Sequence, residues 1–450
     1  MATEHDVVVL GAGNAGLAAA GAARAAGQQV LVVEGRDVGG VCPLRGCVPK
    51  KVLVAAASAL DAIASAHTHQ ISVGAPVLDW PRLIERKRSF VDGVPEELEK
   101  SLAHRGIALL RGCARFTGRH EIAVAGERYS AKKIVVATGS TPRLLPIPGA
   151  EHLVTSDELL ERPSLPESIV FVGAGVIAFE FAHVLARAGA RVTLLEVAPR
   201  VLPTLDPDAT DRLAELTRDL GVRIETSVTI DRIEKRGLGH AIRFHRGDEA
   251  LTVHGEVVAN GAGRIADLAG LDLGAAGITL ERGRVELDEY LRSVENPDVF
   301  FAGDAVPGRP QLSPLATYEG RVVGHNLTHE ELQTVRYGHQ PAVVYTVPGL
   351  ATVGWGEEAA REAGLDFDVR THDMTDWRSA RTHGEKTAWA KVLVERNSGR
   401  ILGAHLVGHG SEETIHTFAL AIEKDMPAAE IAERVYAYPT FHADVKYLVS

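Results

Sequence analysis

The sequence predicts an α/β fold in which two Rossmann-like domains are followed by a C-terminal α+β domain. Two glycine-rich turns, one near the N-terminus and one near residue 175, each follow a short apolar strand and open a helix. A second strand follows each helix, as a parallel α/β unit requires, and each of these strands ends in an acidic residue. From about residue 335 the pattern changes to strands of an antiparallel type. The chain therefore contains a repeated α/β unit and a distinct third region.

The first repeat carries a complete dinucleotide-binding pattern. Its parts are the strand 7–10, the turn glycines Gly11, Gly13 and Gly16, the strand 30–33, and the acid Glu34. The first glycine allows a tight turn, the second lets a pyrophosphate approach the backbone, and the third lets the helix pack closely on the strand. Glu34 is placed to accept hydrogen bonds from ribose hydroxyls.

The second repeat has the same parts with one substitution. They are the strand 168–172, the turn residues Gly173, Gly175 and Ala178, the strand 191–195, and the acid Glu196. Ala178 replaces the third glycine, which close helix–strand packing tolerates. A carboxylate at Glu196 accepts hydrogen bonds from a free ribose 2′-hydroxyl and repels a 2′-phosphate, so NADH is favoured over NADPH. Arg200, four residues on, keeps NADPH as the alternative.

The composition excludes several function classes. The chain has 450 residues and a formal net charge of −11, and its Lys and Arg residues are scattered, so nucleic-acid binding is not expected. No stretch approaches the roughly 20 apolar residues that span a bilayer. The N-terminus shows no signal-peptide charge pattern, and the chain has only three cysteines. We therefore expect a cytoplasmic protein whose cysteine pair is catalytic.

That pair is Cys42 and Cys47, in the stretch Gly39-Gly40-Val41-Cys42-Pro43-Leu44-Arg45-Gly46-Cys47-Val48-Pro49. Proline suits the first turn of a helix, so Cys47 is predicted at or near the N-terminus of a helix that runs to about Ala66. Free backbone N–H groups and the helix dipole at that position lower the pKa of a thiol. The third cysteine, Cys113, is predicted in a buried strand.

This stretch resembles the redox-active disulfide motif of the class I pyridine nucleotide–disulfide oxidoreductases, which include glutathione reductase, dihydrolipoamide dehydrogenase and mercuric reductase. The resemblance covers nearly the whole chain and implies one FAD site and one nicotinamide site. It also implies an interface domain that forms a homodimer. The predicted domains are an FAD-binding domain in two parts, 1–150 and 263–334, an NAD(P)-binding domain, 151–262, and an interface domain, 335–450.

The resemblance implies a path in which electrons pass from NADH through FAD to a Cys42–Cys47 disulfide. Cys47, the cysteine nearer the flavin, is then expected to become the charge-transfer thiolate, and Cys42 attacks the substrate disulfide. Lys50 matches the lysine that lies beside flavin N5 in the family, and Glu180 matches its carboxylate partner. A cation there stabilises electron density on the flavin.

Further cofactor-binding residues follow from the matching motifs. The segment 134–140 corresponds to the family's ATG segment, and the segment 299–305 to its second FAD motif, where Asp304 binds ribityl hydroxyls. Ser313 and Pro314 are predicted to cap a helix that runs to about Leu327. The other residues expected to bind cofactor are Gly40, Lys51, Thr138, Gly139 and Gly263.

The remaining elements are predicted more coarsely. One helix is expected over about 80–104. In the interface domain, strands are expected at 343–346, 351–354, 389–394 and 401–406, and helices at about 411–424 and 428–435.

The C-terminal segment departs from the family pattern. The thiol reductases of the family usually carry His-Pro-Thr-x-x-Glu, supplied across the dimer as an acid–base pair. Here the histidine is replaced by Tyr438 and the glutamate by Ala443. A tyrosine with a pKa near 10 is a poor base at neutral pH but can donate a proton. His442 and Asp444 either provide a displaced base or are simply solvated.

The sequence therefore predicts an FAD-dependent, NADH-preferring enzyme that reduces a small or protein disulfide. The first alternative is a mercuric reductase-like or diaphorase-like reductase of metal ions or quinones, since the mercuric reductase branch also has tyrosine at this position. No C-terminal cysteine pair of the kind which that branch uses is present. The second alternative is a non-catalytic flavoprotein partner, and the intact Cys42–Cys47 pair argues against it.

Overall fold

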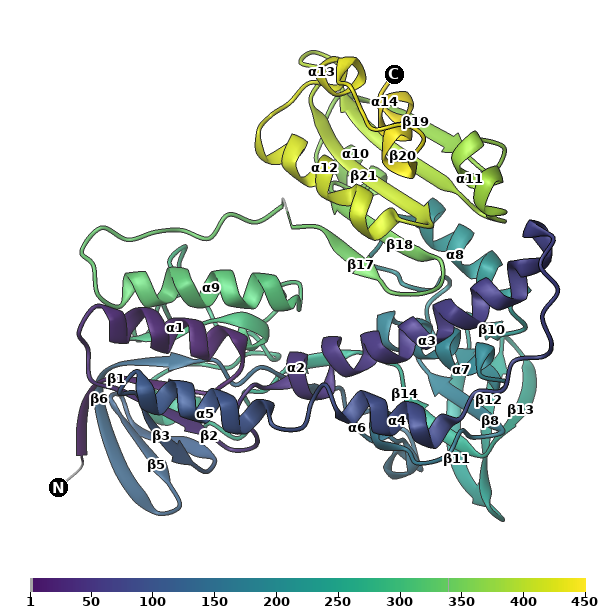
Figure 1. The fold of residues 1–450 in the computed structure, drawn as a ribbon. Coiled ribbons are helices and arrows are strands. Elements are labelled where there is room, and N and C mark those ends of the chain that lie inside the picture. The colour runs from purple at the N-terminus through teal and green to yellow at the C-terminus, as the bar shows by residue number, and fades with distance from the viewer. Residues whose placement is uncertain (1–2, 339) are drawn as a thin grey trace. The chain divides into compact units, whose positions relative to one another are not determined.

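The structure is a computed structural model that describes residues 3–338 and 340–450. The chain divides into two compact units (Figure 1). The first unit contains residues 1–50, 85–143 and 264–336, and the second contains 51–84, 144–263 and 337–450. The mixed α/β architecture and the distinct C-terminal sheet confirm the predicted fold class. The division into FAD, NAD(P) and interface domains stays a prediction.

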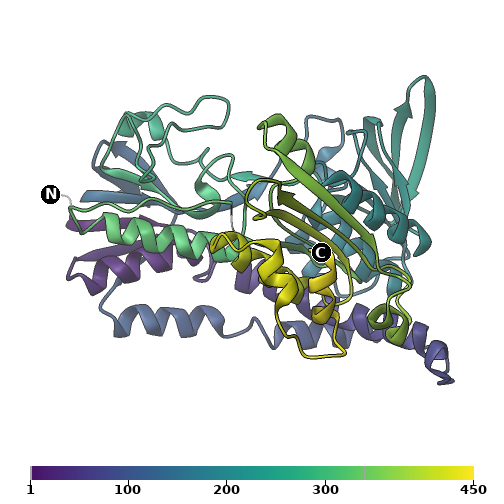
Figure 2. The ribbon, with the colours of Figure 1, turned by 90° about the horizontal axis from the view of Figure 1, so that it is seen from above.

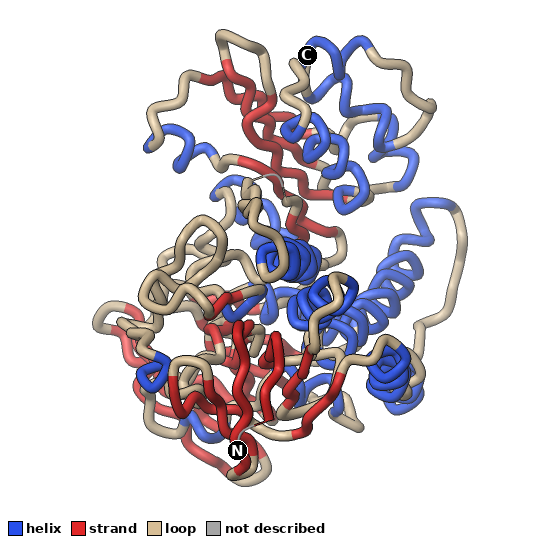
Figure 3. The backbone as a smooth tube through the Cα atoms, turned by 90° about the vertical axis from the view of Figure 1, so that its left-hand side faces the viewer, coloured by secondary structure: helices blue, strands red, loops and turns tan. Residues whose placement is uncertain are grey.

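The first unit is built on a mainly parallel sheet. Its strands are β1 (Thr3–Leu10), β2 (Val30–Glu34), β3 (Ala108–Arg111), β4 (Ala114–Gly118), β5 (Glu121–Val124), β6 (Glu127–Val136) and β16 (Val299–Phe301). β3, β2, β1 and β6 pair in that order in parallel, β16 joins β6 in parallel, and β5 and β4 extend the sheet antiparallel. Figure 3 shows these strands side by side near the N-terminus. Both faces of the central strands are buried, which explains their continuous apolar runs.

Two helices of the first unit, α1 (Asn14–Ala25) and α9 (Ser313–Asn326), pack closely side by side (Figure 2). A Cβ atom on Gly320 would lie 2.3 Å from the Ala15 carbonyl oxygen, and one on Gly324 would lie 2.5 Å from Ala22 Cβ. The small residues on both helices therefore allow the close approach. As a result, the N-termini of the two helices lie next to each other, since Asn14 at the start of α1 hydrogen-bonds to Ser313 at the start of α9.

The other elements of the first unit are short. They are α2 (Val41–Arg45), α5 (Val94–His104), β7 (Ser140–Pro142), which pairs with β15 (Arg264–Ala266), and the 3₁₀ helices η3 (Leu273–Ala276) and η4 (Gly303–Ala305). α3 (Cys47–Ser65) begins in this unit and ends one residue before the predicted Ala66. A single helix over 80–104 was wrong. Two helices occupy the range, α4 (Trp80–Arg88) and α5. Gly93, at φ +88°, interrupts the helical conformation, and Pro95 lies in the first turn of the new helix.

The second unit contains a parallel four-stranded sheet with the order β10-β9-β8-β14. These strands are β8 (Ser168–Val172), β9 (Arg191–Leu195), β10 (Arg223–Glu225) and β14 (Val257–Asn260), and the helices are α6 (Ser156–Glu161), α7 (Val176–Arg187) and α8 (Pro207–Asp219). An antiparallel sheet that the sequence analysis did not predict follows, made of β11 (Thr229–Arg236), β12 (Gly239–Arg246) and β13 (Glu249–Gly255). Two 3₁₀ helices, η1 (Ala66–His69) and η2 (Ala150–His152), complete this part.

The C-terminal part of the second unit is an antiparallel five-stranded sheet with the order β17-β18-β21-β20-β19. Its strands are β17 (Ala342–Val344), β18 (Gly349–Gly354), β19 (Phe367–Asp373), β20 (Trp389–Glu395) and β21 (Ile401–Gly408). Its helices are α10 (Glu357–Glu362), α11 (Arg378–His383), α12 (Ser411–Glu423), α13 (Ala428–Glu433), η5 (Phe441–Asp444) and α14 (Val445–Leu448). α12 packs across β18 and β21, and the predicted strands and helices of this region are confirmed to within a few residues. β19, α10 and α11 were not predicted.

Within the described residues, 3–338 and 340–450, no helix combines the length and the apolar content that crossing a bilayer requires.

Candidate active site

Cys42 and Cys47 lie together in the first unit. Cys42 is in α2, Cys47 is the first residue of α3, and their sulfurs are within hydrogen-bonding distance. Both are free thiols, so the structure has the pair in its reduced form. The loop between them consists of the single residue Gly46 beyond α2, and a Cβ atom on Gly46 would lie 3.0 Å from the Val41 carbonyl oxygen. The glycine therefore permits the turn that brings the sulfurs together.

The two thiols have opposite proton affinities. Hydrogen bonds from the Cys47 thiol, the Ser313 hydroxyl and the Asn14 amide lower the pKa of Cys42 to about 6, against the effect of burial. The adjacent Cys42 thiolate and burial raise the pKa of Cys47, and the nearby Lys50 ammonium opposes this only in part. The sequence analysis expected the helix N-terminus to lower the pKa of Cys47. In this structure the lowered pKa is instead that of Cys42, because that sulfur receives the hydrogen bonds.

Ser313 does not cap its helix as expected. The N-cap position of α9 is Leu312, and within the described structure no side chain caps this helix. The Ser313 hydroxyl is used elsewhere, since it accepts a hydrogen bond from the Asn14 amide and lies within hydrogen-bonding distance of Cys42. Neither Asn14 nor the contact of Ser313 with Cys42 was identified from the sequence.

Cys113 is exposed and lies between β3 and β4, so its assignment to a buried strand was wrong. It follows Gly112, whose φ of +144° marks the turn at which the chain leaves β3.

The glycine turn of the first unit has the geometry of a dinucleotide cradle. Gly11 has φ +105°, and a Cβ atom there would lie 2.3 Å from the Ala137 carbonyl oxygen. Gly13 and Gly40 approach so closely that a Cβ atom on Gly40 would lie 2.8 Å from Gly13 Cα. Among the described residues no side chain caps α1. Its first N–H groups are therefore available to an anion, as pyrophosphate binding requires.

Glu34 closes this turn through two backbone hydrogen bonds. Its carboxylate accepts from the backbone N–H of Ala12 and from that of Arg36, both at 2.7 Å. The carboxylate is thus fixed at the carboxyl end of β2, where its remaining lone pairs suit ribose hydroxyls.

A second polar group lies around Asp304 in the same unit. The Ser140 hydroxyl donates to Asp304 at 2.9 Å and accepts from Arg264 Nε at 2.9 Å. Burial raises the pKa of Asp304 from its ordinary value, although Ser140 and Arg264 oppose this. The buried Glu319 carboxylate in α9 accepts from the Gly303 backbone N–H at 2.6 Å and fixes the turn just before Asp304. Glu319 was not identified from the sequence, because a helical glutamate gives no signal of burial.

Thr138 and Gly139 form a turn at the end of β6. The Thr138 hydroxyl donates to the Asp267 carbonyl oxygen at 2.7 Å, and Gly139 has φ +77°. This turn joins the segment after β6 to the segment after β15.

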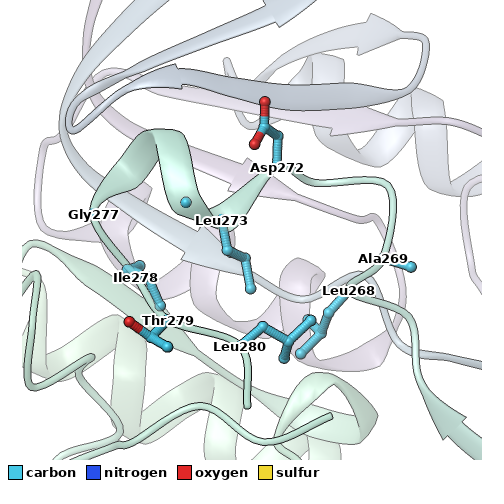
Figure 4. A pocket seen from close by; sticks show the side chains of 9 residues that line it. Leu268, Ala269, Asp272, Leu273, Gly277, Ile278, Thr279 and Leu280 are labelled. Atoms are coloured by element: carbon cyan, nitrogen blue, oxygen red, sulfur yellow. The ribbon is translucent and has the colours of Figure 1, made fainter. Parts of the chain in front are cut away.

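The first unit also has a surface depression of about 470 Å³ (Figure 4). Of its nine lining residues only Asp272 is ionisable, and the side chains of Leu268, Leu273, Ile278 and Leu280 dominate the lining. Neither redox cysteine lines it, so it is not the redox site.

The second glycine turn repeats the geometry of the first. Gly173 has φ +100°, and a Cβ atom there would lie 2.5 Å from the Ala262 backbone nitrogen. The buried Glu196 accepts from the N–H of Ala174 at 2.7 Å and from that of Ala198 at 2.9 Å. The N-cap of α7 is Gly175, and within the described residues no side chain caps this helix. The turn therefore fits a second dinucleotide. Gly263, at φ +88°, follows the neighbouring strand β14.

Glu180 is a buried residue of α7. Its carboxylate accepts a hydrogen bond from the Tyr345 backbone N–H at 2.8 Å. The Lys51 ammonium lies over the Tyr345 ring, 4.1 Å from its centroid. Lys50 itself lies on the first turn of α3 in the first unit, close enough to Cys47 to affect its pKa.

In the C-terminal segment the Tyr438 side chain is exposed, whereas the residues that follow it contact their own domain. The Tyr438 side chain is 63% exposed. The His442 ring lies within 3.1 Å of the Thr417 hydroxyl and packs edge-on against Tyr436, and Asp444 hydrogen-bonds to Ser379. Ala443 is buried. His442 and Asp444 are thus held by residues of the same domain, whereas Tyr438 is available to another molecule.

Comparison with known proteins decides the family. Residues 5–320 match the pyridine nucleotide-disulphide oxidoreductase family, and residues 340–449 match the dimerisation domain of these enzymes. The chain belongs to this family. It is therefore a flavin-dependent disulfide oxidoreductase of a group that uses FAD and pyridine nucleotides, and the dimerisation domain supports a homodimer.

Several relatives cover the chain almost completely. A dihydrolipoyl dehydrogenase from Geobacillus stearothermophilus is 30% identical, over 98% of this chain and 94% of the relative. A mercuric reductase from Staphylococcus aureus is 29% identical, over 98% of this chain and 81% of the relative. A solved structure of the Cu(II) complex of the HOCl-induced flavoprotein disulfide reductase RclA from Escherichia coli has a TM-score of 0.88 at 27% identity and covers 99% of both chains.

Proposed function

We propose that this oxidoreductase passes electrons from NADH, through FAD and the Cys42–Cys47 pair, to a small or protein disulfide. The observation that carries the proposal is the adjacent pair of thiols, with the Cys42 sulfur surrounded by hydrogen-bond donors. Bound FAD supplies the two-electron chemistry that links the nicotinamide to the cysteine pair. The steps below concern the protein's own groups.

The proposed reduction begins with the Cys42 thiolate attacking one sulfur of the substrate disulfide. The substrate S–S bond breaks, a mixed disulfide with Cys42 forms, and the first leaving thiolate takes a proton. Cys47 then loses its proton and attacks the Cys42 sulfur. The second substrate thiol leaves, and the Cys42–Cys47 disulfide is restored. A pKa of about 6 keeps Cys42 ionised at neutral pH, which supports its assignment as the attacking group.

The proposed proton donor is Tyr438 of the partner subunit in a family-like homodimer. Its exposure supports this, since the side chain is not committed to its own domain. The hydrogen bond between His442 and Thr417 favours an anchoring role for His442 over that of a displaced base. Lys50 and Glu180 are proposed to act as the cation and carboxylate beside the flavin.

The adenosine diphosphate part of FAD is proposed to bind at Gly11, Gly13, Gly16, Glu34 and Gly40. The ribityl and flavin part is proposed to bind at Thr138, Gly139 and Asp304, with Lys51 beside it. Gly173, Gly175, Glu196 and Gly263 are proposed for the nicotinamide nucleotide. NADH is the proposed donor, because Glu196 offers a fixed carboxylate to the ribose 2′-hydroxyl and Arg200 is engaged by Glu358.

A second candidate is the reduction of metal ions or quinones. Tyr438 in place of the usual histidine favours it, as do the likeness to mercuric reductase and the likeness to RclA, which has been solved as a Cu(II) complex. Hg(II) or Cu(II) would then be the substrate, bound by the cysteine thiolates. We also propose a cytoplasmic location, because the chain has only three cysteines and a cysteine pair in such a chain fits catalysis in a reducing compartment better than a structural disulfide.

A steady-state screen with NADH against disulfides, quinones, Cu(II) and Hg(II) tests the proposal. A disulfide that is turned over with a kcat/KM above about 10⁴ M⁻¹s⁻¹ supports it, since this is the lower end for natural substrates. Alkylating the reduced enzyme separates disulfide reduction from quinone reduction, and the screen itself separates disulfides from metal ions, which also need the free thiolates. Disulfide reduction must then be lost, whereas direct transfer to quinones must persist. Turnover of metal ions or quinones alone would establish the second candidate.

A further inference from the structure

Three elements of the first unit converge on the Cys42 sulfur. The sulfur is within hydrogen-bonding distance of the Cys47 thiol and backbone, the Ser313 hydroxyl and the Asn14 amide. Asn14 begins α1, Cys42 lies in α2, and Ser313 begins α9. The close packing of α1 on α9 makes this possible, since Gly320 and Gly324 let the two helix starts meet beside α2.

The direction of the hydrogen bond between Asn14 and Ser313 fixes the role of each group. Asn14 Nδ2 donates to Ser313 Oγ, and an amide nitrogen donates but does not accept. The Ser313 hydroxyl has a single proton, and that proton is not used toward Asn14. It is therefore available to the Cys42 sulfur, which accepts it best as a thiolate.

The charged groups near the pair do not replace these donors. Lys50, on the first turn of α3, affects the pKa of Cys47, whereas the largest interactions that lower the pKa of Cys42 come from Cys47, Ser313 and Asn14. Arg45, on α2 itself, pairs with Asp37 at 3.1 Å. The uncharged donors are thus the direct means by which this site stabilises a thiolate on Cys42.

We propose that Ser313 is a catalytic residue that donates a hydrogen bond to the Cys42 thiolate, and that Asn14 is the positioning residue that orients its hydroxyl. When the internal disulfide is reduced by two electrons, Cys42 leaves with the electron pair of the S–S bond, and Ser313 stabilises the developing charge. The same hydrogen bond from Ser313 holds the Cys42 thiolate until it attacks the substrate. This inference rests on the proposed role of Cys42 as the attacking thiol.

The test measures the pH dependence of alkylation in the reduced holoenzyme. All variants carry Cys113→Ser, which removes the third, exposed thiol. Iodoacetamide is added under anaerobic conditions at a series of pH values on both sides of the Cys42 pKa, and mass spectrometry of peptides assigns the label to Cys42 or Cys47. The parent protein should label at Cys42, with a rate that rises through about pH 6 and then levels off.

Ser313→Ala should raise the alkylation pKa of Cys42 by about one unit. The thiolate fraction at low pH then falls about tenfold. The intrinsic nucleophilicity of a thiolate rises about threefold per unit of pKa, so the observed rate should fall only about threefold at pH values below both pKa values. Above both pKa values the rate should rise about threefold. A merely structural defect would lower the rate at both ends, so the crossing of the two profiles identifies the donor role.

Three further variants complete the experiment. Ser313→Thr keeps the hydroxyl and should retain the parent profile. Asn14→Asp replaces the donating amide with a carboxylate and should raise the pKa at least as much as Ser313→Ala. Thr317→Ala removes a hydroxyl one turn along α9 that donates to the Ser313 carbonyl oxygen, and it should change nothing. The visible absorbance of each protein reports its flavin content.

Identical profiles for Ser313→Ala and the parent would overturn the proposal, and so would a uniform loss of rate at all pH values. A shift in Thr317→Ala as large as that in Ser313→Ala would also overturn it. Labelling of Cys47 in place of Cys42 in the parent would overturn both this inference and the proposed roles of the two thiols. A shifted profile in a protein that turns over no disulfide would leave the inference standing and reject the proposed substrate.

Discussion

The Arg200 guanidinium donates a hydrogen bond to the Glu358 carboxylate at 3.1 Å, with Nη2 also bonded to the Pro203 carbonyl oxygen. Arg200 follows the nucleotide-binding acid Glu196 by four residues, and Glu358 lies in α10. The arginine that the sequence offers as a phosphate-binding group is therefore already paired with a carboxylate.

This pairing predicts a preference for NADH that one substitution weakens. Glu358→Gln releases Arg200 toward a 2′-phosphate and should raise kcat/KM for NADPH by up to about fivefold, because an exposed ion pair contributes about 0–1 kcal/mol. kcat/KM for NADH should not change. Steady-state kinetics with both cofactors provide the measurement, and Glu362→Gln, on the same short helix, is the control. A parent enzyme that prefers NADPH would show that Glu196 does not select the nucleotide.

Gly261 packs directly against the second glycine turn, so a side chain at this position is expected to disturb the packing. A Cβ atom on Gly261 would lie 2.3 Å from the Gly173 carbonyl oxygen and 2.9 Å from Ala178 Cβ. Gly261→Ala should therefore destabilise the protein by about 1–3 kcal/mol and weaken NADH binding. Thermal unfolding and NADH titration measure the two effects.

Two further variants examine the cause of that defect. Gly274→Ala places a Cβ atom where nothing lies within 4 Å, so its unfolding temperature should match that of the parent. Combining Gly261→Ala with Ala178→Gly should restore only part of the stability, since the contact with Gly173 remains. Full recovery in the double variant would show that the backbone contact costs nothing.

His183 predicts a dependence of stability on pH. It is fully buried in α7, its two ring nitrogens lie near the Thr217 hydroxyl and the Val347 backbone, and burial lowers its pKa to about 3, with the Arg187 charge acting in the same direction. The folded state therefore keeps the ring neutral, while the unfolded chain binds a proton below about pH 6.5. The free energy of unfolding therefore has its full value with respect to this histidine above about pH 6.5. It falls by up to about 1.4 kcal/mol per pH unit as the pH is lowered toward about 3.

His183→Gln retains hydrogen-bonding groups without this titration. Urea unfolding of both proteins at about pH 7 and about pH 5 should show that the parent loses about 2 kcal/mol more than the variant. His120→Gln, which removes an exposed histidine near Asp298, should behave as the parent does. Equal losses in the parent and in His183→Gln would show that the buried ring takes up a proton without opening the fold.

The sequence predicts the repeated α/β units because their signals are local. Gly11, Gly173, Glu34 and Glu196 each act within one strand–turn–helix segment, and the geometry there follows from backbone rules. The break between α4 and α5 was missed although its signals, Gly93 and Pro95, are local. Asn14 and the role of Ser313 beside Cys42 were missed because they depend on the packing of α1 against α9, which joins segments about 300 residues apart, and no local pattern records this. Glu319 was missed because a helical glutamate gives no signal that it is buried and bonded to Gly303.

The last prediction concerns Tyr438 as the proton donor. Tyr438→Phe removes the exposed hydroxyl without changing the apolar ring, so disulfide turnover should fall. General acid–base catalysis contributes a factor of about 10²–10⁴, and a tyrosine hydroxyl that can donate a proton supplies part of it. Reduction of the flavin by NADH should not change, because that step precedes proton transfer to the substrate. Stopped-flow absorbance and steady-state turnover measure the two steps separately.

Tyr438→His should raise turnover, since an imidazole both accepts and donates a proton near neutral pH. Ala443→Glu, which would complete the usual family pattern, is not expected to help. Ala443 is buried, so the new carboxylate would be desolvated. Val435→Ala removes a fully exposed side chain of the same segment and is the control. Full disulfide turnover in Tyr438→Phe would remove the hydroxyl from the mechanism and leave reduction of metal ions or quinones, which needs no such donor, as the activity to pursue.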